Sequence, residues 1–139
     1  MRYEGTLSGG DMMARAIHRT FRALPIACFP LALLSDIAYW QTSNLLWLHF
    51  SEWLLLAGVI GVALALLAGG IDRLVRRVRP SWPAVLMGIV VFGLAVLNNL
   101  VHTADGWTAV VPWGLVLSAA TVVAMLLTAW FGRKGNLHA

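Results

Sequence analysis

Seven polar residues stand at the ends of apolar stretches, and their side chains could support redox or proton chemistry. They are Asp36, His49, Glu52, Asn98, Asn99, His102 and Asp105. A neutral imidazole can ligate haem iron or another transition metal, and a carboxylate on its second ring nitrogen strengthens the ligand. His49 and His102, from two different helices, could supply two axial ligands to a haem b. A histidine beside Asp36 or Glu52 could instead hold a quinol and accept its proton.

The same residues also allow explanations without a cofactor. His49 and Glu52 lie three apart on one helical face, and side chains at the end of a membrane span reach interface water. Asp36 has apolar neighbours and no nearby base in sequence, so we expect an interhelical partner such as Asn98 or His102. Interfacial side chains, a redox or proton-handling site and a structural hydrogen-bond network are therefore three open interpretations.

The composition around these residues is that of a membrane protein. Of 139 residues, 60% are hydrophobic and 12% are charged, against about 45–50% and about 25% in a soluble domain. A chain of this length cannot bury such an excess, and one cysteine, Cys28, makes no internal bridge. These values exclude a soluble enzyme, a disordered chain and a disulfide-stapled secreted module. No phosphate-binding loop or nucleophile elbow is present, so we predict no catalytic residue.

Four stretches are long and apolar enough to cross a membrane, which takes about 20 residues each. They cover residues 23–40, 46–71, 82–101 and 110–131. Strand-like alternation is absent, so the predicted fold is an all-α integral membrane protein with four antiparallel transmembrane helices. We expect a flexible tail over residues 1–14, a short basic interfacial helix over 12–22, and one domain over 15–139.

Two features predict how the spans are shaped and packed. Pro25 marks a bend at the start of the first span, and Pro30 predicts a kink inside it. A small-residue face on the second span consists of Gly58, Gly61, Ala65 and Gly69. Such a face permits close helix contact, which we expect inside this chain rather than in a dimer.

The basic residues predict the orientation. All ten lysines and arginines lie near the termini or between the second and third spans, and none lies in connections 41–45 and 102–109. Because Lys and Arg in short loops stay cytoplasmic, both termini and the middle connection should face the cytoplasm. The net charge of +4 follows from these flanks, so no nucleic-acid partner is expected. Tryptophans cluster on the outer side, where indoles anchor in the headgroup zone or wall a cofactor.

A series of short motifs runs along the chain. They are His18, Pro25-Ile26-Ala27, Asp36, the run from Trp53 to Gly58, Gly69-Gly70-Ile71-Asp72, Ala129-Trp130-Phe131-Gly132 and His138. Their order and spacing resemble a bacterial four-helix membrane family, domain of unknown function 2231, over residues 18 to 138. The chain departs from that pattern at Arg19, where the family usually has proline, and at Ala129, where it has glycine. It also lacks a histidine beside Trp82.

The resemblance implies a role next to redox modules, including Rieske-type and cytochrome domains. If the family's histidines bind a cofactor, His18 and His138 inherit that role, and they lie on the cytoplasmic side, opposite His49 and His102. We therefore expect a non-catalytic subunit of the bacterial inner membrane that binds haem b or quinone and serves a redox partner in the membrane or periplasm. Two alternatives are a cofactor-free structural anchor or assembly subunit, and a proton or small-solute carrier working as a homo-oligomer.

Overall fold

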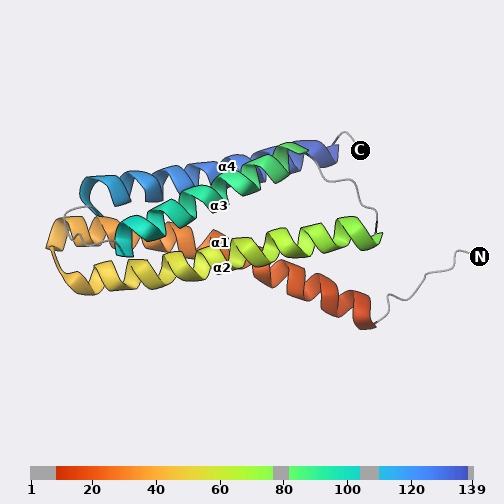
Figure 1. Cartoon of the computed structure of the whole chain (residues 1–139), viewed down its shortest axis with the longest axis horizontal. Helices are drawn as coiled ribbons and strands as arrows, with labels where there is room; N and C mark the ends of the chain where they lie inside the picture. The colour runs from red at the N-terminus through yellow and green to blue at the C-terminus, as the bar shows by residue number, and fades with distance from the viewer. Residues whose placement is uncertain (1–8, 77–81, 104–109, 138–139) are drawn as a thin grey trace, which may run out of the picture.

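A computed structural model describes residues 9–76, 82–103 and 110–137, without the side chains of residues 11, 14, 15, 18, 76 and 131–137. The elements are α1 (Gly9–Thr42), α2 (Leu45–Arg76), α3 (Trp82–Thr103), the short turn η1 (Val110–Gly114) and α4 (Leu115–Leu137). The helices alternate in direction along the bundle (Figure 1). The described residues contain no strand.

Each long helix contains a stretch that could cross a membrane. These stretches are Arg19–Thr42, Leu45–Val75, Trp82–Thr103 and Val110–Trp130. The predicted fold class, an all-α protein with four membrane-crossing helices, is confirmed. The predicted bounds differ by at most four residues, at 23 against Arg19 and at 71 against Val75. We call the end of the bundle where α1 and α3 finish the histidine end, and the end where α2 and α4 finish the arginine end.

The basic N-terminal segment and the first span form one continuous helix. α1 runs from Gly9 to Thr42 and includes both Pro25 and Pro30. Residues 12–22, predicted as an interfacial helix, are therefore the first part of α1, and so are residues 9–14 of the predicted tail; residues 1–8 lie outside the described part. Figure 1 shows this first part of α1 leaning away from α3 and α4.

A tight turn joins α1 to α2 at the histidine end. Ser43 has a φ of 53°, and its N–H donates to the Tyr39 carbonyl at 2.7 Å, which ends α1 in a left-handed residue. Asn44 then caps α2, because its side-chain Oδ1 accepts a hydrogen bond from the Leu46 N–H at 3.0 Å. The chain reverses within two residues, so the beginning of α2 lies alongside the end of α1.

Glycines on α2 set its distance from α1. A Cβ added at Gly58 would overlap the Phe29 ring, and one added at Gly61 would lie 2.8 Å from the Leu24 Cβ. A Cβ at Gly69 would meet nothing within 4 Å. The expected close contact inside the chain is therefore present at Gly58 and Gly61 and absent at Gly69.

Helix α4 begins after a break at η1. Val111 there has a φ of −119° and a ψ of 115°, as expected for a residue that precedes proline. The break lets Gly114 face the ring of His102 on α3: a Cβ at Gly114 would lie 2.9 Å from the His102 Cε1. A side chain at this position would displace the imidazole.

The bundle consists of two closely packed helix pairs, α1 with α2 and α3 with α4. Buried apolar side chains from all four helices join the pairs midway along the bundle: Phe29, Ala32, Leu55, Val62, Val91, Ala95 and Ala124. Tryptophans are exposed towards both ends, including Trp40, Trp53 and Trp113 near the histidine end and Trp82 and Trp130 near the arginine end. Two such belts are typical of helices anchored in a bilayer.

Candidate functional site

Five buried polar side chains meet inside the bundle near the histidine end. They are Asp36 on α1, Ser51 on α2, Asn98 and His102 on α3, and Ser118 on α4, each at most 4% exposed. We call this group the polar cluster. Polar groups in a membrane interior are costly unless they bond to one another, so a group drawn from four helices must be held together by its own hydrogen bonds.

Asp36 is the centre of the polar cluster. Its Oδ1 accepts a hydrogen bond from the Ser51 hydroxyl at 2.5 Å and lies 2.9 Å from the His102 Nε2. Its Oδ2 accepts a hydrogen bond from the Ser118 hydroxyl. Three partners from three other helices therefore surround one carboxyl group that is 1% exposed.

His102 uses both ring nitrogens inside the protein. Its Nδ1 lies 2.9 Å from the Asn98 carbonyl oxygen, one turn earlier on α3. A carbonyl can only accept, so Nδ1 is a donor. Its Nε2 contacts Asp36, as described above. The expected interhelical partner of Asp36 is therefore present, and it is His102.

Asn98 has one side-chain polar atom that no described residue pairs. Its side-chain Nδ2 donates to the Ser118 hydroxyl oxygen at 2.7 Å. Its Oδ1 is fully buried and accepts no hydrogen bond from any described residue. Buried acceptors are almost always paired, so this atom marks a place where the polar cluster is incomplete.

The other residues predicted to share this site lie outside the polar cluster or outside the described residues. The side chains of His49 and Glu52 are 64% and 26% exposed, and the His49 Nδ1 lies 3.2 Å from the Glu52 Oε2. His18 belongs to α1, but its side chain is not described, and His138 and Asp105 lie outside the described residues. Among the described side chains, no three of His, Cys, Asp and Glu gather where they could hold a metal ion.

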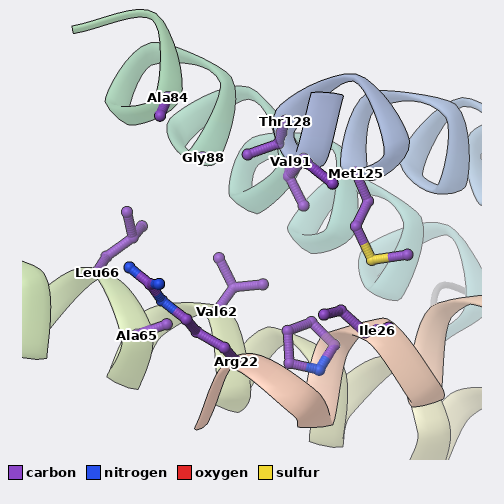
Figure 2. Close-up of a pocket in the computed structure, with 12 residues that line it drawn as sticks. Arg22, Ile26, Val62, Ala65, Leu66, Ala84, Gly88, Val91, Met125 and Thr128 are labelled. Atoms are coloured by element: carbon purple, nitrogen blue, oxygen red, sulfur yellow. The ribbon is translucent and has the colours of Figure 1, made fainter. Parts of the chain in front are cut away.

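A cavity of about 440 Å³ lies nearer the arginine end. Figure 2 shows it between the α1–α2 pair and the α3–α4 pair. Its wall consists of Arg22, Pro25, Ile26, Val62, Ala65, Leu66, Ala84, Gly88, Val91, Met125, Thr128 and Ala129. Of the described side chains in this wall, Arg22 is the one that carries a charge. The Thr128 hydroxyl already donates to the Ala124 carbonyl at 2.8 Å.

The family of this chain follows from its sequence. A family described as predicted membrane protein (DUF2231) matches residues 14–137. The chain belongs to this family. No curated protein and no solved structure matches it.

Residues of the sequence motifs described above contribute to both features of the bundle. Pro25, Ile26 and Ala129 line the cavity at the arginine end. Asp36 is the centre of the polar cluster. Gly58 leaves the space that the Phe29 ring occupies. The motifs thus mark the cavity as well as the buried carboxylate.

Sequence reasoning missed Ser51 and Ser118, which complete the polar cluster. The available signal was a hydroxyl inside an apolar span: Ser118 lies in the first half of the fourth span, and Ser51 stands between two residues already singled out, His49 and Glu52. Sequence reasoning also missed the cavity, whose lining residues are mostly small and apolar.

Proposed function

We propose that this chain is a small membrane subunit of an electron-transfer system that binds a quinone in the cavity at the arginine end. The cavity carries the proposal. Its volume of about 440 Å³ falls within the range of about 300–1,000 Å³ that ligand sites occupy, and such sites are mainly apolar with a few polar groups that fix orientation. A quinone matches this chemistry, because it is an apolar ring with two carbonyl oxygens on an apolar tail.

Arg22 supplies the polar group that such a ring requires. Its guanidinium has five N–H donors and no acceptor, so it can donate to a carbonyl oxygen. Figure 2 shows the side chain extending from α1 over α2 towards Leu66, on one side of the cavity. Gly88 on α3 leaves room on the opposite wall, where a side chain would narrow the space. When bound, a quinone would carry electrons and protons to a redox partner.

Quinone fits the described residues better than haem does. An axial ligand needs a free imidazole nitrogen, and both nitrogens of His102 are engaged inside the protein. The His49 side chain is 64% exposed and lies outside the polar cluster, so the two histidines do not share one buried site. Among the side chains that the structure describes, no histidine lines the cavity. Haem ligation by His49 and His102 stays a prediction, and so does ligation by His18 and His138. An absorption spectrum after haem reconstitution tests it: absence of a Soret band removes haem, and a band lost in His18→Ala but kept in His49→Ala assigns it to the arginine end.

Quinone titration of the purified, detergent-solubilised protein tests the proposal. A short-chain ubiquinone is titrated by calorimetry into the wild type, Arg22→Gln and Gly88→Leu. We expect Arg22→Gln to weaken binding about tenfold, the loss of one charge-assisted hydrogen bond, and Gly88→Leu to abolish it. Arg73→Gln is the matched control, since Arg73 lies outside the cavity, with its guanidinium 5.1 Å from the Trp82 ring centroid. Absence of binding, or equal affinity in all four proteins, contradicts the proposal.

The polar cluster favours one second candidate, a cofactor-free anchor or assembly subunit. Hydrogen bonds from α2, α3 and α4 to Asp36 on α1 fix the four helices against one another, which suits a scaffold for a partner protein. If quinone does not bind, this candidate predicts that His49→Ala leaves a partner complex intact, whereas a bulky residue at Gly61 disrupts it.

We also propose that the arginine end faces the cytoplasm of a bacterial inner membrane. Arg19, Arg22 and Arg73 lie near this end, whereas the turn at Ser43 and Asn44 carries no basic residue. A membrane-impermeant thiol reagent applied to intact cells should label Ser43→Cys and spare Gly9→Cys, both in a Cys28→Ser background. The reverse pattern would place the arginine end outside.

A further inference from the structure

The polar cluster holds one proton between two of its members. The Nδ1 hydrogen of His102 is committed to the Asn98 carbonyl. The contact of 2.9 Å between His102 Nε2 and Asp36 Oδ1 needs one further proton, on either the imidazole or the carboxyl group. In both arrangements Asp36 and His102 together carry no net charge.

Removal of this proton would leave a buried negative charge. The titratable residues on the neighbouring stretches of helix are Tyr39 on α1 and His49 and Glu52 on α2. Residues 110–121, which form η1 and the start of α4, include no charged residue. An uncompensated charge in a bundle interior is strongly unfavourable, so the deprotonated cluster requires a cation.

We propose that the polar cluster binds one sodium ion in exchange for this proton. Oxygen atoms are the preferred ligands of hard cations, and Asp36, Ser51, Asn98 and Ser118 bring them from four helices. The Asn98 Oδ1 is buried and has no hydrogen-bond partner among the described residues, so it is the acceptor left free for the ion. The Ser51 hydroxyl hydrogen has a second acceptor in the Ala32 carbonyl at 3.4 Å, so its oxygen can turn a lone pair towards the ion.

The charge of the site selects a monovalent ion. One carboxylate balances one positive charge, whereas a divalent ion would leave a net positive charge buried. In the exchange one sodium ion enters and one proton leaves, with Asp36 ionised and His102 neutral, so the net charge stays zero. The site is separate from the cavity that contains Arg22, and the two proposals can fail independently.

The test measures ion-specific stabilisation and proton release together. The melting temperature of the purified protein is recorded against sodium chloride, with choline chloride at equal ionic strength as reference, and proton release is followed with a pH electrode in weakly buffered solution. We expect sodium to raise the melting temperature, as any ligand of the folded state does, and to release one proton per ion bound. The apparent sodium affinity should rise about tenfold for each pH unit, as a one-for-one exchange requires.

Two variants assign the effect to the polar cluster. Asn98→Ala removes the free acceptor and should weaken the apparent sodium affinity about tenfold, whereas Asn99→Ala, the next residue and partly exposed, should not. Asp36→Asn should abolish proton release. If Asp36→Asn does not fold, the comparison of Asn98→Ala with Asn99→Ala tests whether sodium binds at the polar cluster. The proposal is wrong if choline and sodium act alike, if binding releases no proton, or if both asparagine variants bind sodium as the wild type does.

Discussion

Asp36 on α1 and His102 on α3 are 66 residues apart in the sequence, and their side chains meet at 2.9 Å inside the bundle. Ser51 and Ser118 bond to the same carboxyl group from the two remaining helices. One ionisable residue therefore determines how four apolar helices align. In lipid, helices gain little free energy from apolar contact with each other. Polar contacts such as these therefore fix how the helices align.

Asp36→Ala should lower the free energy of unfolding by about 3–5 kcal/mol, because it leaves a buried imidazole and two hydroxyls without their partner. Glu52→Ala removes a carboxylate from a partly exposed pair and should change it by less than about 1 kcal/mol. Unfolding in mixed detergent micelles, followed by circular dichroism, compares the two. Similar losses in both variants would show that Asp36 does not hold the helices together.

Gly58→Ala should destabilise the protein by about 1–3 kcal/mol, since the added methyl group would overlap the Phe29 ring between α1 and α2. Gly69→Ala on the same helix is the control, because a Cβ there meets nothing within 4 Å. Thermal unfolding of both variants measures the difference. Equal melting temperatures would contradict the close packing of α1 against α2.

Gly114→Ala should displace His102, because the new Cβ would lie 2.9 Å from the ring Cε1. The expected signs are a changed NMR chemical shift of the His102 ring and a stability loss of about 1–3 kcal/mol. Gly93→Ala on α3, where a Cβ meets nothing within 4 Å, should leave the ring signal in place. An unchanged signal in Gly114→Ala would mean that the two helices are further apart than described.

Ser43→Gly should stabilise the protein by about 0.5–1 kcal/mol. Ser43 has a φ of 53°, a conformation that glycine adopts without the steric cost that a side chain brings. Chemical unfolding compares this variant with Thr42→Gly, which places glycine at the last residue of helix α1 and should lower the stability. A loss of stability in Ser43→Gly would argue against a left-handed residue at the end of α1.

The sequence was sufficient for the helices and for part of the polar cluster. Apolar length predicted four spans, and the isolation of Asp36 among apolar residues predicted an interhelical partner. Asn98 and His102 lie four apart on one helix, so one face carries both. The partners on the other helices were beyond prediction, because Ser51 and Ser118 reach Asp36 only in one relative rotation of α2 and α4.

Two features of the bundle lay beyond prediction for a similar reason. His49 and His102 lie in the same third of the bundle, yet the rotation of α2 directs His49 to the surface and Ser51 to the interior. The cavity depends on how the two helix pairs separate towards the arginine end, and no single residue in the sequence predicts that separation. Neither a helix rotation nor a crossing angle can be read from hydrophobic periodicity at the precision that a site requires.

Photolabelling tests the quinone proposal most directly. A photoreactive quinone is bound to the purified protein, irradiated, and located by mass spectrometry of peptides. Labels are expected on residues of the cavity wall such as Ile26, Leu66 and Met125, with labelling reduced by excess ubiquinone and by Gly88→Leu. Labels confined to the lipid-facing tryptophans, or unaffected by both competitions, would contradict quinone binding in the cavity.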